Sequence, residues 1–134
     1  MSQENLELVR ALYAAWGHGD FSSLDWVDPD VEYVVADGPE PATFKGVNGM
    51  AEYGRGLLAA WEDWRVEAEE YRALDDERVL VLDRHSGRGR TSGLNVDRMT
   101  GRGASVFRIC GGKVSRLVVY WDRDRALVDL GLVE

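Results

Sequence analysis

The alternation of apolar and polar residues between positions 104 and 122 predicts a β-hairpin. Side chains of one face recur at every second residue on either side of a glycine pair, and they are Ser105, Phe107, Ile109, Leu117, Val119 and Trp121. The pair Gly111-Gly112 can supply the positive φ angles that a tight turn requires. We expect this face to line one concave surface, which is either a core or the wall of a ligand pocket.

The apolar period changes to that of a helix in the first half of the chain. Residues 2–16 place apolar side chains on one stripe and charged side chains opposite, which predicts an amphipathic helix. A short second helix is expected over residues 21–27, with Asp20 as its cap. A third helix is expected over residues 49–61, capped by Asn48.

Gly54 lies on the apolar stripe of that third helix. A glycine inside a helix costs about 1 kcal/mol relative to alanine. We therefore expect another element or a ligand to approach the helix closely at Gly54, and helix-on-sheet packing is the simpler of these two explanations.

Strand signals dominate the rest of the chain. The predicted strands are residues 31–36, 64–74, 78 to the glycine-rich turn at 87–93, 94–99 and the two arms of the hairpin. Residues 37–46 contain two prolines and are expected to form a loop. A short helix should follow Asp122 or Asp124 as its cap and stop at Gly131. Helices early and consecutive strands late predict an α+β domain with the helices on one face of an antiparallel sheet.

The strand that begins at residue 78 is apolar on both faces over its first half. Val79 and Val81 alternate with Leu80 and Leu82. A strand of this kind is buried on both sides, so an element or a partner must cover the outer face of the sheet.

Composition limits the function classes. The chain of 134 residues is expected to form one domain, 1–134, and its net charge of −8 argues against nucleic-acid or anionic-membrane binding, because phosphate contacts need a positive face. The single cysteine, Cys110, excludes an intrachain disulfide and a cysteine metal cluster. With no signal-peptide pattern at the N-terminus and no long apolar run, we expect a cytoplasmic protein that acts on a small hydrophobic molecule without a metal or cofactor.

Four stretches carry a family resemblance, and they are LYAAWGHGD, GVNGMAEY, WEDWRVEAEEYRALDDERVLVL and FRICGGKVSRLVVYWD. Together with the order of elements, they resemble the SnoaL-like branch of the nuclear transport factor 2-like superfamily. That superfamily includes ketosteroid isomerases, limonene epoxide hydrolases and polyketide cyclases. The resemblance implies a cone in which a curved antiparallel sheet wraps around three N-terminal helices and encloses an apolar pocket. It also implies a homodimer formed through the outer sheet face.

The resemblance to ketosteroid isomerases points to particular positions. Asp37 stands where those enzymes hold a catalytic aspartate, at the end of the first strand. Their oxyanion-binding tyrosine aligns with Leu12, and Tyr13 lies one position away, about 100° around the helix. Their protonated aspartate, whose raised pKa is a known example of a neutral carboxyl donor, corresponds to Ser105. Two of the three catalytic positions of the ketosteroid isomerases therefore carry a different residue here, which argues against steroid isomerisation.

Other members of the superfamily suggest simpler chemistry. The arginine and aspartates of the epoxide hydrolases are poorly matched by Arg84 and Asp83, because strand alternation puts these two on opposite faces. A cyclase-like site needs one base with a shifted pKa and a donor for the enolate oxygen, which Asp37 with Asp83 or His85 could supply. The structural alternatives are that Asp37 bonds backbone amides in a turn and that Asp83 and His85 form an exposed strand end.

The predicted ligand-binding residues are mostly aromatic, and they are Tyr13, Trp16, Trp26, Tyr33, Tyr53, Leu57, Ser105, Phe107 and Trp121. A carboxylate in a cavity lined by such side chains would have a raised pKa, as a base requires. The favoured function is an acid/base isomerase, cyclase or hydrolase acting on a small hydrophobic molecule. The alternatives are a non-catalytic ligand-binding or dimerisation module and, with less support, a protein-partner adaptor.

Overall fold

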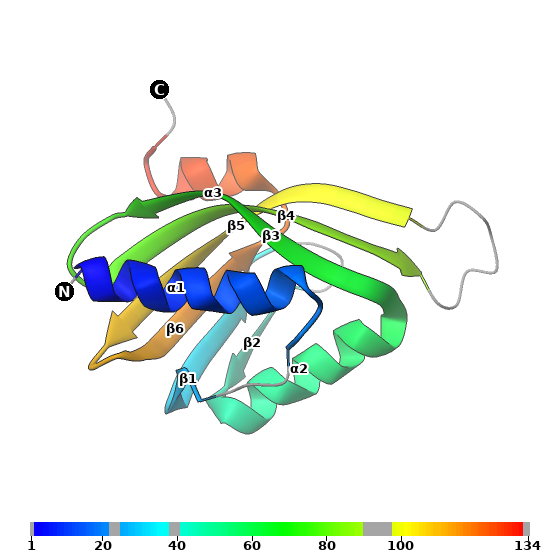
Figure 1. The fold of residues 1–134 in the computed structure, drawn as a ribbon, viewed down its shortest axis with the longest axis horizontal. Coiled ribbons are helices and arrows are strands. Elements are labelled where there is room, and N and C mark those ends of the chain that lie inside the picture. Colours follow the sequence, from blue (N-terminus) through cyan, green and yellow to red (C-terminus); the bar gives the residue numbers. More distant parts are fainter. Residues whose placement is uncertain (1, 22–24, 38–40, 90–97, 133–134) are drawn as a thin grey trace.

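The computed structural model describes residues 2–21, 25–37, 41–89 and 98–132. Over these residues the elements follow in the order α1 (Ser2–Gly17), β1 (Val27–Val35), β2 (Ala42–Lys45), α2 (Gly46–Ala60), β3 (Trp61–Ala73), β4 (Arg78–Gly89), β5 (Arg98–Cys110), β6 (Lys113–Tyr120) and α3 (Arg123–Asp129) (Figure 1). The α+β class is confirmed. The expectation of three N-terminal helices is wrong, because the helices lie at the N-terminus, in the middle and at the C-terminus of the chain.

The strands form one sheet in the order β2-β1-β6-β5-β4-β3. The sheet is mixed rather than antiparallel, because β1 runs parallel to β6. Val35 lies beside Val119 in that pairing, so the first strand of the chain reaches the wall formed by the hairpin. The hairpin itself is confirmed: β5 and β6 pair antiparallel, and Gly111 and Gly112 have φ angles of 60° and 78°.

The described residues of the segment 21–27 do not form the predicted helix. Residues 22–24 lie outside the described residues, Trp26 is in a turn, and Val27 already begins β1. Pro29 cannot donate to a sheet ladder, and it falls where the β1–β6 register shifts, between Val27 and Glu32. Strand β1 therefore accommodates the proline at this irregularity in its pairing.

The predicted loop over residues 37–46 contains a strand. Residues 38–40 lie outside the described residues, but Ala42–Lys45 forms β2 and pairs antiparallel with β1. The next helix begins at Gly46 with Lys45 as its N-cap, so Asn48 is not the cap. The predicted cap of the last helix is confirmed, since the Asp122 side chain accepts a hydrogen bond from the Asp124 N–H at 3.0 Å.

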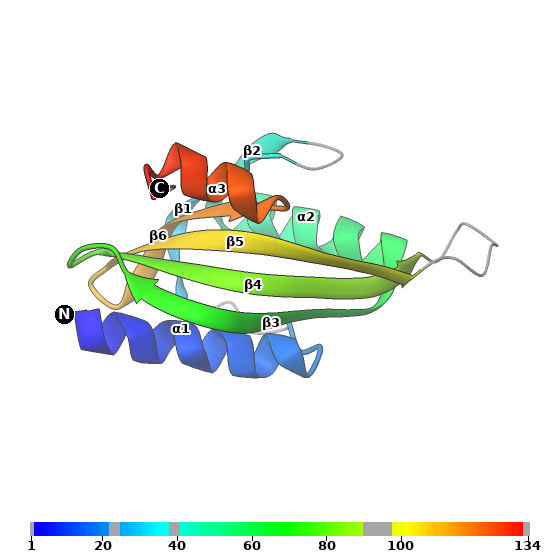
Figure 2. The same ribbon diagram turned by 90° about the horizontal axis from the view of Figure 1, so that it is seen from above.

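Two hydrophobic clusters lie on opposite faces of the sheet. On the concave face, α1 packs through Val9 and Leu12 against Val79, Val81 and Phe107. On the outer face, α3 packs against the alternate residues of the same strands, and this cluster contains Leu80, Leu82, Ala104, Val106, Tyr120 and Ala126 (Figures 1 and 2). The helices therefore do not lie on one face, and α3 explains why β4 is apolar on both sides.

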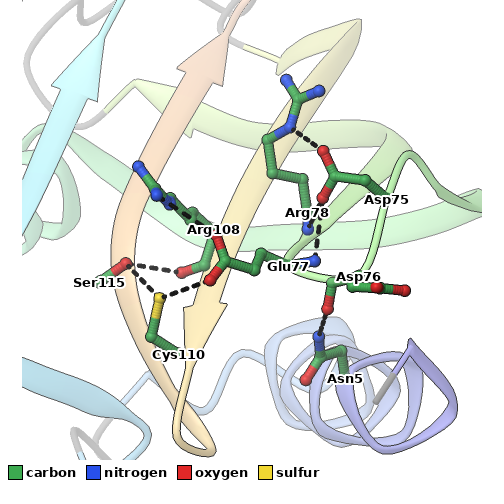
Figure 3. A network of polar contacts seen from close by, with 8 residues as sticks. All are labelled: Asn5, Asp75, Asp76, Glu77, Arg78, Arg108, Cys110 and Ser115. Carbon is green, nitrogen blue, oxygen red and sulfur yellow. Dashed lines mark hydrogen bonds and ion pairs between the residues drawn. The ribbon is translucent and has the colours of Figure 1, made fainter.

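A polar network closes the end of the sheet where α1 begins (Figure 3). The Asn5 amide donates to the Asp76 carbonyl oxygen at 3.0 Å, which ties α1 to the β3–β4 turn. Asp75 accepts hydrogen bonds from the backbone N–H groups of Glu77 and Arg78, and Glu77 accepts one from Arg108 of β5. The turn between β3 and β4 is thus held by its own carboxylates, several residues away from Asp83 along β4.

Candidate functional site

A cavity of about 280 Å³ opens between the concave face of the sheet and α2. Of the predicted ligand-binding residues, those that line it are Trp16, Trp26, Tyr33, Tyr53, Leu57, Ser105 and Trp121. Asp83 and His85 also reach it, whereas Asp37, Tyr13 and Phe107 do not line it. The lining is mostly aromatic and aliphatic, as in sites that bind small organic molecules.

Asp83 is the buried carboxyl of this cavity, with 4% of its surface exposed. It lies on β4 opposite Gly103, on the same face as Val79 and Val81. The Tyr13 hydroxyl, from α1, donates to Asp83 Oδ2 at 2.7 Å, and the Ser105 hydroxyl, from β5, donates to the same oxygen at 3.1 Å. Ser105, at one position that the resemblance associates with a donor, and Tyr13, one residue from the other such position, therefore hold one carboxyl group in place.

Burial raises the pKa of Asp83 to about 6, because a carboxylate loses hydration in the cavity wall. The hydrogen bonds from Tyr13 and Ser105 and the positive charge of Arg123 lower this pKa and limit the increase. Burial also raises the pKa of Tyr13 well above its usual value, and the neighbouring Asp83 charge adds to this shift. Tyr13 therefore remains a donor while Asp83 changes protonation close to neutral pH.

His85 lies two residues beyond Asp83 on the same strand face and is 8% exposed. Its ring stacks on Trp64, with centroids 5.6 Å apart, and meets Trp121 edge-on at 5.0 Å. Burial lowers the pKa of His85, and the Asp37 charge opposes this effect. The imidazole is thus held as a neutral group that can donate from one nitrogen and accept at the other.

Two glycines on β5 make room for this pair. Gly101 lies opposite His85, and a Cβ atom there would come within 2.5 Å of His85 Nε2. A Cβ atom on Gly103 would come within 2.4 Å of the Tyr120 carbonyl oxygen and within 3.1 Å of Asp83 Oδ1. The absence of side chains at Gly101 and Gly103 therefore allows His85 and Asp83 to pack closely against β5.

Asp37 ends the first strand, as expected, but both of its carboxylate oxygens bind backbone. Oδ1 accepts from the Trp121 N–H at 2.5 Å, and Oδ2 accepts from the Asp122 N–H at 3.1 Å. The residue is 7% exposed. Asp37 thus bonds backbone amides, as in its structural alternative, although these amides lie at the β6–α3 junction rather than in its own turn.

Tyr13 and Phe107 belong to the core beneath α1. Phe107 is fully buried, and its ring lies 6.0 Å from that of Tyr13. Trp16 contacts both rings, at 4.9 Å from Tyr13 and 6.2 Å from Phe107, and also lines the cavity. The aromatic side chains therefore form a continuous layer from the core to the cavity.

The wall formed by α2 was only partly predicted. Met50, Ala51, Arg55 and Leu58 line the cavity in addition to Tyr53 and Leu57. Met50 shares the helical stripe of Tyr53 and Leu57, so its position could have been inferred from spacing, whereas Arg55 could not. A Cβ atom on Gly54 would meet no atom within 4 Å, so the packing expected at Gly54 is not observed and the glycine borders open cavity space.

Among the described residues, no group of three or more His, Cys, Asp and Glu side chains could hold a metal ion. Within the same part of the chain, no helix is both long and apolar enough to span a membrane.

The sequence model of the SnoaL-like domain matches residues 9–117. No curated protein matches the chain. An NTF2-like protein of unknown function from Burkholderia pseudomallei K96243 is similar in structure, with 20% identity, coverage of 93% of this chain and 95% of that one, and a TM-score of 0.76.

Two other similar structures contain small molecules. TerC, co-crystallised with polyporic acid, is 23% identical, with coverage of 95% of this chain and 97% of that one and a TM-score of 0.73. A protein with a ketosteroid isomerase-like fold from Catenulispora acidiphila, in complex with trimethylamine, is 18% identical, with coverage of 95% and 94% and a TM-score of 0.70. Since the family match spans most of the chain and the structures share its architecture, the protein belongs to the SnoaL-like family and has the NTF2-like, ketosteroid isomerase-like fold.

Proposed function

We propose that this protein is an acid/base enzyme that moves a proton on a small, apolar carbonyl compound, with Asp83 as the group that accepts and returns the proton. The observation that carries the proposal is a buried carboxyl at the cavity wall, oriented by Tyr13 and Ser105, with its pKa raised to about 6. A general base works best when its pKa lies near the pH at which it operates. Asp83 fits this requirement better than Asp37, whose two oxygens bind backbone amides.

The proposed reaction begins at a carbon next to the substrate carbonyl. Tyr13 and Ser105 hold Oδ2 of Asp83, and we assign Oδ1 to the substrate. Oδ1 accepts the proton, the C–H electron pair moves into the enolate, and the neutral His85 imidazole donates a hydrogen bond to the enolate oxygen. In a substrate with a C=C bond conjugated to the enolate, return of the proton from Asp83 to the far carbon completes an isomerisation. In a substrate with a second carbonyl group, the enolate carbon attacks that carbonyl carbon, the C=O electron pair moves to oxygen, and Asp83 returns its proton to the resulting alkoxide, which completes a cyclisation.

The size and lining of the cavity support a small substrate. Its volume of about 280 Å³ lies just below the range of about 300–1,000 Å³ that is usual for small-molecule sites. Tryptophan and tyrosine rings on several elements exclude water from the buried end, which strengthens hydrogen bonds to a developing charge. The small molecules bound by TerC and by the Catenulispora acidiphila protein are consistent with ligand binding in this fold.

Proton exchange on a model ketone tests the proposal. The probe is 2-tetralone in D2O, whose loss of α-protons is followed by NMR with and without protein. Wild-type protein should accelerate the exchange, with a rate that rises through about pH 6 as Asp83 loses its proton. Asp83→Asn should reduce this acceleration by about 100-fold or more, the usual contribution of a general base.

Asp37→Asn is the matched comparison, because it makes the same chemical change at the other buried carboxyl near the cavity. It should retain exchange if Asp83 is the base. Loss of exchange in Asp37→Asn and its retention in Asp83→Asn would reverse the assignment. Binding of 2-tetralone without any acceleration would instead support the non-catalytic ligand-binding module.

A further inference from the structure

Arg55 is the one Lys or Arg side chain among the described residues that line the cavity. It lies on α2 next to Gly54 and is exposed, so it marks the end of the cavity that faces solvent. His85, the other basic group in the lining, is kept neutral by burial. The open end of an otherwise aromatic cavity therefore carries a permanent positive charge.

Seven other described arginines have carboxylate partners, and they are Arg72, Arg78, Arg84, Arg108, Arg116, Arg123 and Arg125. Arg10, Arg65 and Arg102 have no such partner among the described side chains, but they do not line the cavity. Among the side chains that the structure describes, no Asp or Glu lies within ion-pair distance of Arg55. With a net charge of −8, an arginine left without such a partner at a cavity entrance is available for a ligand.

The charges at the two ends of the cavity are opposite and separate. Asp83 is 4% exposed and is held by Tyr13 and Ser105 at the buried end, whereas Arg55 is exposed on α2. An anionic group would be repelled by ionised Asp83 and attracted by Arg55. A ligand with one charged end would therefore enter with its apolar part first.

We infer that the substrate is a small carbonyl compound with an apolar body and one carboxylate, which is bound by Arg55 at the cavity entrance while the carbon next to the carbonyl group lies at Asp83. This inference rests on the proposed function for the identity of the reacting end. Arginine suits the task because its planar guanidinium can bind both oxygens of a carboxylate. Arg55 is thus a residue that determines which substrates bind and in which direction.

A pair of probes that differ only in charge tests the inference. The probes are 3-phenylpropanoate and 3-phenylpropanamide, and binding is measured from the indole N–H signals of the cavity tryptophans in NMR titrations. Wild-type protein should bind the carboxylate about 3- to 10-fold more tightly than the amide at low salt, the range for a partly exposed charged hydrogen bond. Added NaCl should reduce this preference.

Arg55→Gln should abolish the preference and leave affinity for the amide unchanged, and Arg55→Lys should retain part of it. The matched control is Arg125→Gln, which removes the same charge from α3 on the outer face, where Arg125 pairs with Asp129 at 3.9 Å. The control should keep the wild-type preference, because the effect depends on the position of the charge.

The outcomes separate this inference from the proposed function. Equal binding of the two probes by wild-type protein, or an equal loss of preference in Arg125→Gln, would overturn the role of Arg55 and leave the exchange activity of Asp83 unaffected. If neither probe shifts the indole signals, the cavity does not bind molecules of this class and the inference fails. If wild-type protein prefers the carboxylate probe but does not accelerate proton exchange on 2-tetralone, only the catalytic role of Asp83 is overturned.

Discussion

The two helices on the concave side of the sheet make very different contacts with it. Helix α1 buries Val9, Leu12 and Tyr13, which retain 7% exposure or less, in a cluster with Val79 and Phe107. No described side chain of α2 is buried, although several of them line the cavity. One half of the concave face is thus a packed core, and the other half is a cavity with a helix as its wall.

The side chains of the two helices explain the difference. The inward stripe of α1 carries Leu, Val and aromatic residues that fill the space above the strands. Helix α2 contains Gly49, Gly54 and Gly56, and Cβ atoms on Gly54 and Gly56 would meet no atom within 4 Å. Gly54 is the glycine of α2 that lines the cavity among the described residues, and the side chain missing there leaves cavity space unfilled.

The largest expected difference in stability is between two leucine-to-alanine variants, one in α1 and one in α2. Leu12→Ala should lower the free energy of unfolding by about 2–5 kcal/mol, because it leaves a cavity in a packed core. Leu57→Ala removes the same atoms from a half-buried position beside existing empty space, so it should cost less than about 1 kcal/mol. Urea denaturation of both variants measures the difference. Equal losses would show that α2 is packed as firmly as α1.

The next largest effect is the pH dependence of stability that Asp83 causes. Asp83 lies at the cavity wall and is bound by Tyr13 of the packed core. Its folded-state pKa of about 6 lies above the value of about 3.9 expected in the unfolded chain, so the protonated form favours folding. This stabilisation is complete below about pH 4 and is lost as the pH rises through about 6. The loss should amount to about 3 kcal/mol.

Unfolding curves recorded from pH 4 to pH 8 check this expectation. Wild-type protein should lose stability relative to Asp83→Asn across that interval, because asparagine cannot ionise. The difference between the two proteins isolates Asp83 from the other carboxylates of the chain. Parallel curves for the two proteins would contradict a raised pKa at this site.

The smallest expected effect is a gain in stability rather than a loss. Gly54→Ala should raise the free energy of unfolding by up to about 1 kcal/mol, because alanine favours the helix and its Cβ meets no atom within 4 Å. Gly103→Ala is the matched control on β5, where the added Cβ would clash with the Tyr120 carbonyl oxygen, and it should lower stability by about 1–3 kcal/mol. Thermal unfolding separates the two. A destabilising Gly54→Ala would show that α2 approaches the sheet more closely.

Local patterns predicted the elements whose signals lie within a few residues. The hairpin follows from Gly111-Gly112 and period-two alternation, and both α1 and the Asp122 cap of α3 follow from spacing and side-chain type. Helix α3 on the outer face was not foreseen, because an amphipathic segment does not indicate which face of a sheet it covers. Strand β2 was missed because its pairing with β1 outweighs the loop signal of the prolines before it.

The sequence indicated which residues lie near the cavity better than it indicated what each of them does there. Asp83 and His85 were named as candidates for acid/base chemistry, and the structure places both on one face of β4 at the cavity. Their burial could not be predicted, because it depends on α1, β3 and β5 meeting around them. The opposite holds for Asp37, whose position at the end of β1 was correct but whose two acceptor bonds reach the distant Trp121 and Asp122.

The sequence by itself determined the α+β class and the hairpin at Gly111-Gly112, because both follow from patterns of neighbouring residues. Only the tertiary structure decided which carboxyl group is held at the cavity and which is used as an anchor. Tyr13, Asp83 and Ser105 lie on three separate elements, and their meeting at one oxygen depends on strand register and helix placement. The pKa of Asp83 follows from that arrangement, since burial and hydrogen-bond donors are properties of the folded chain.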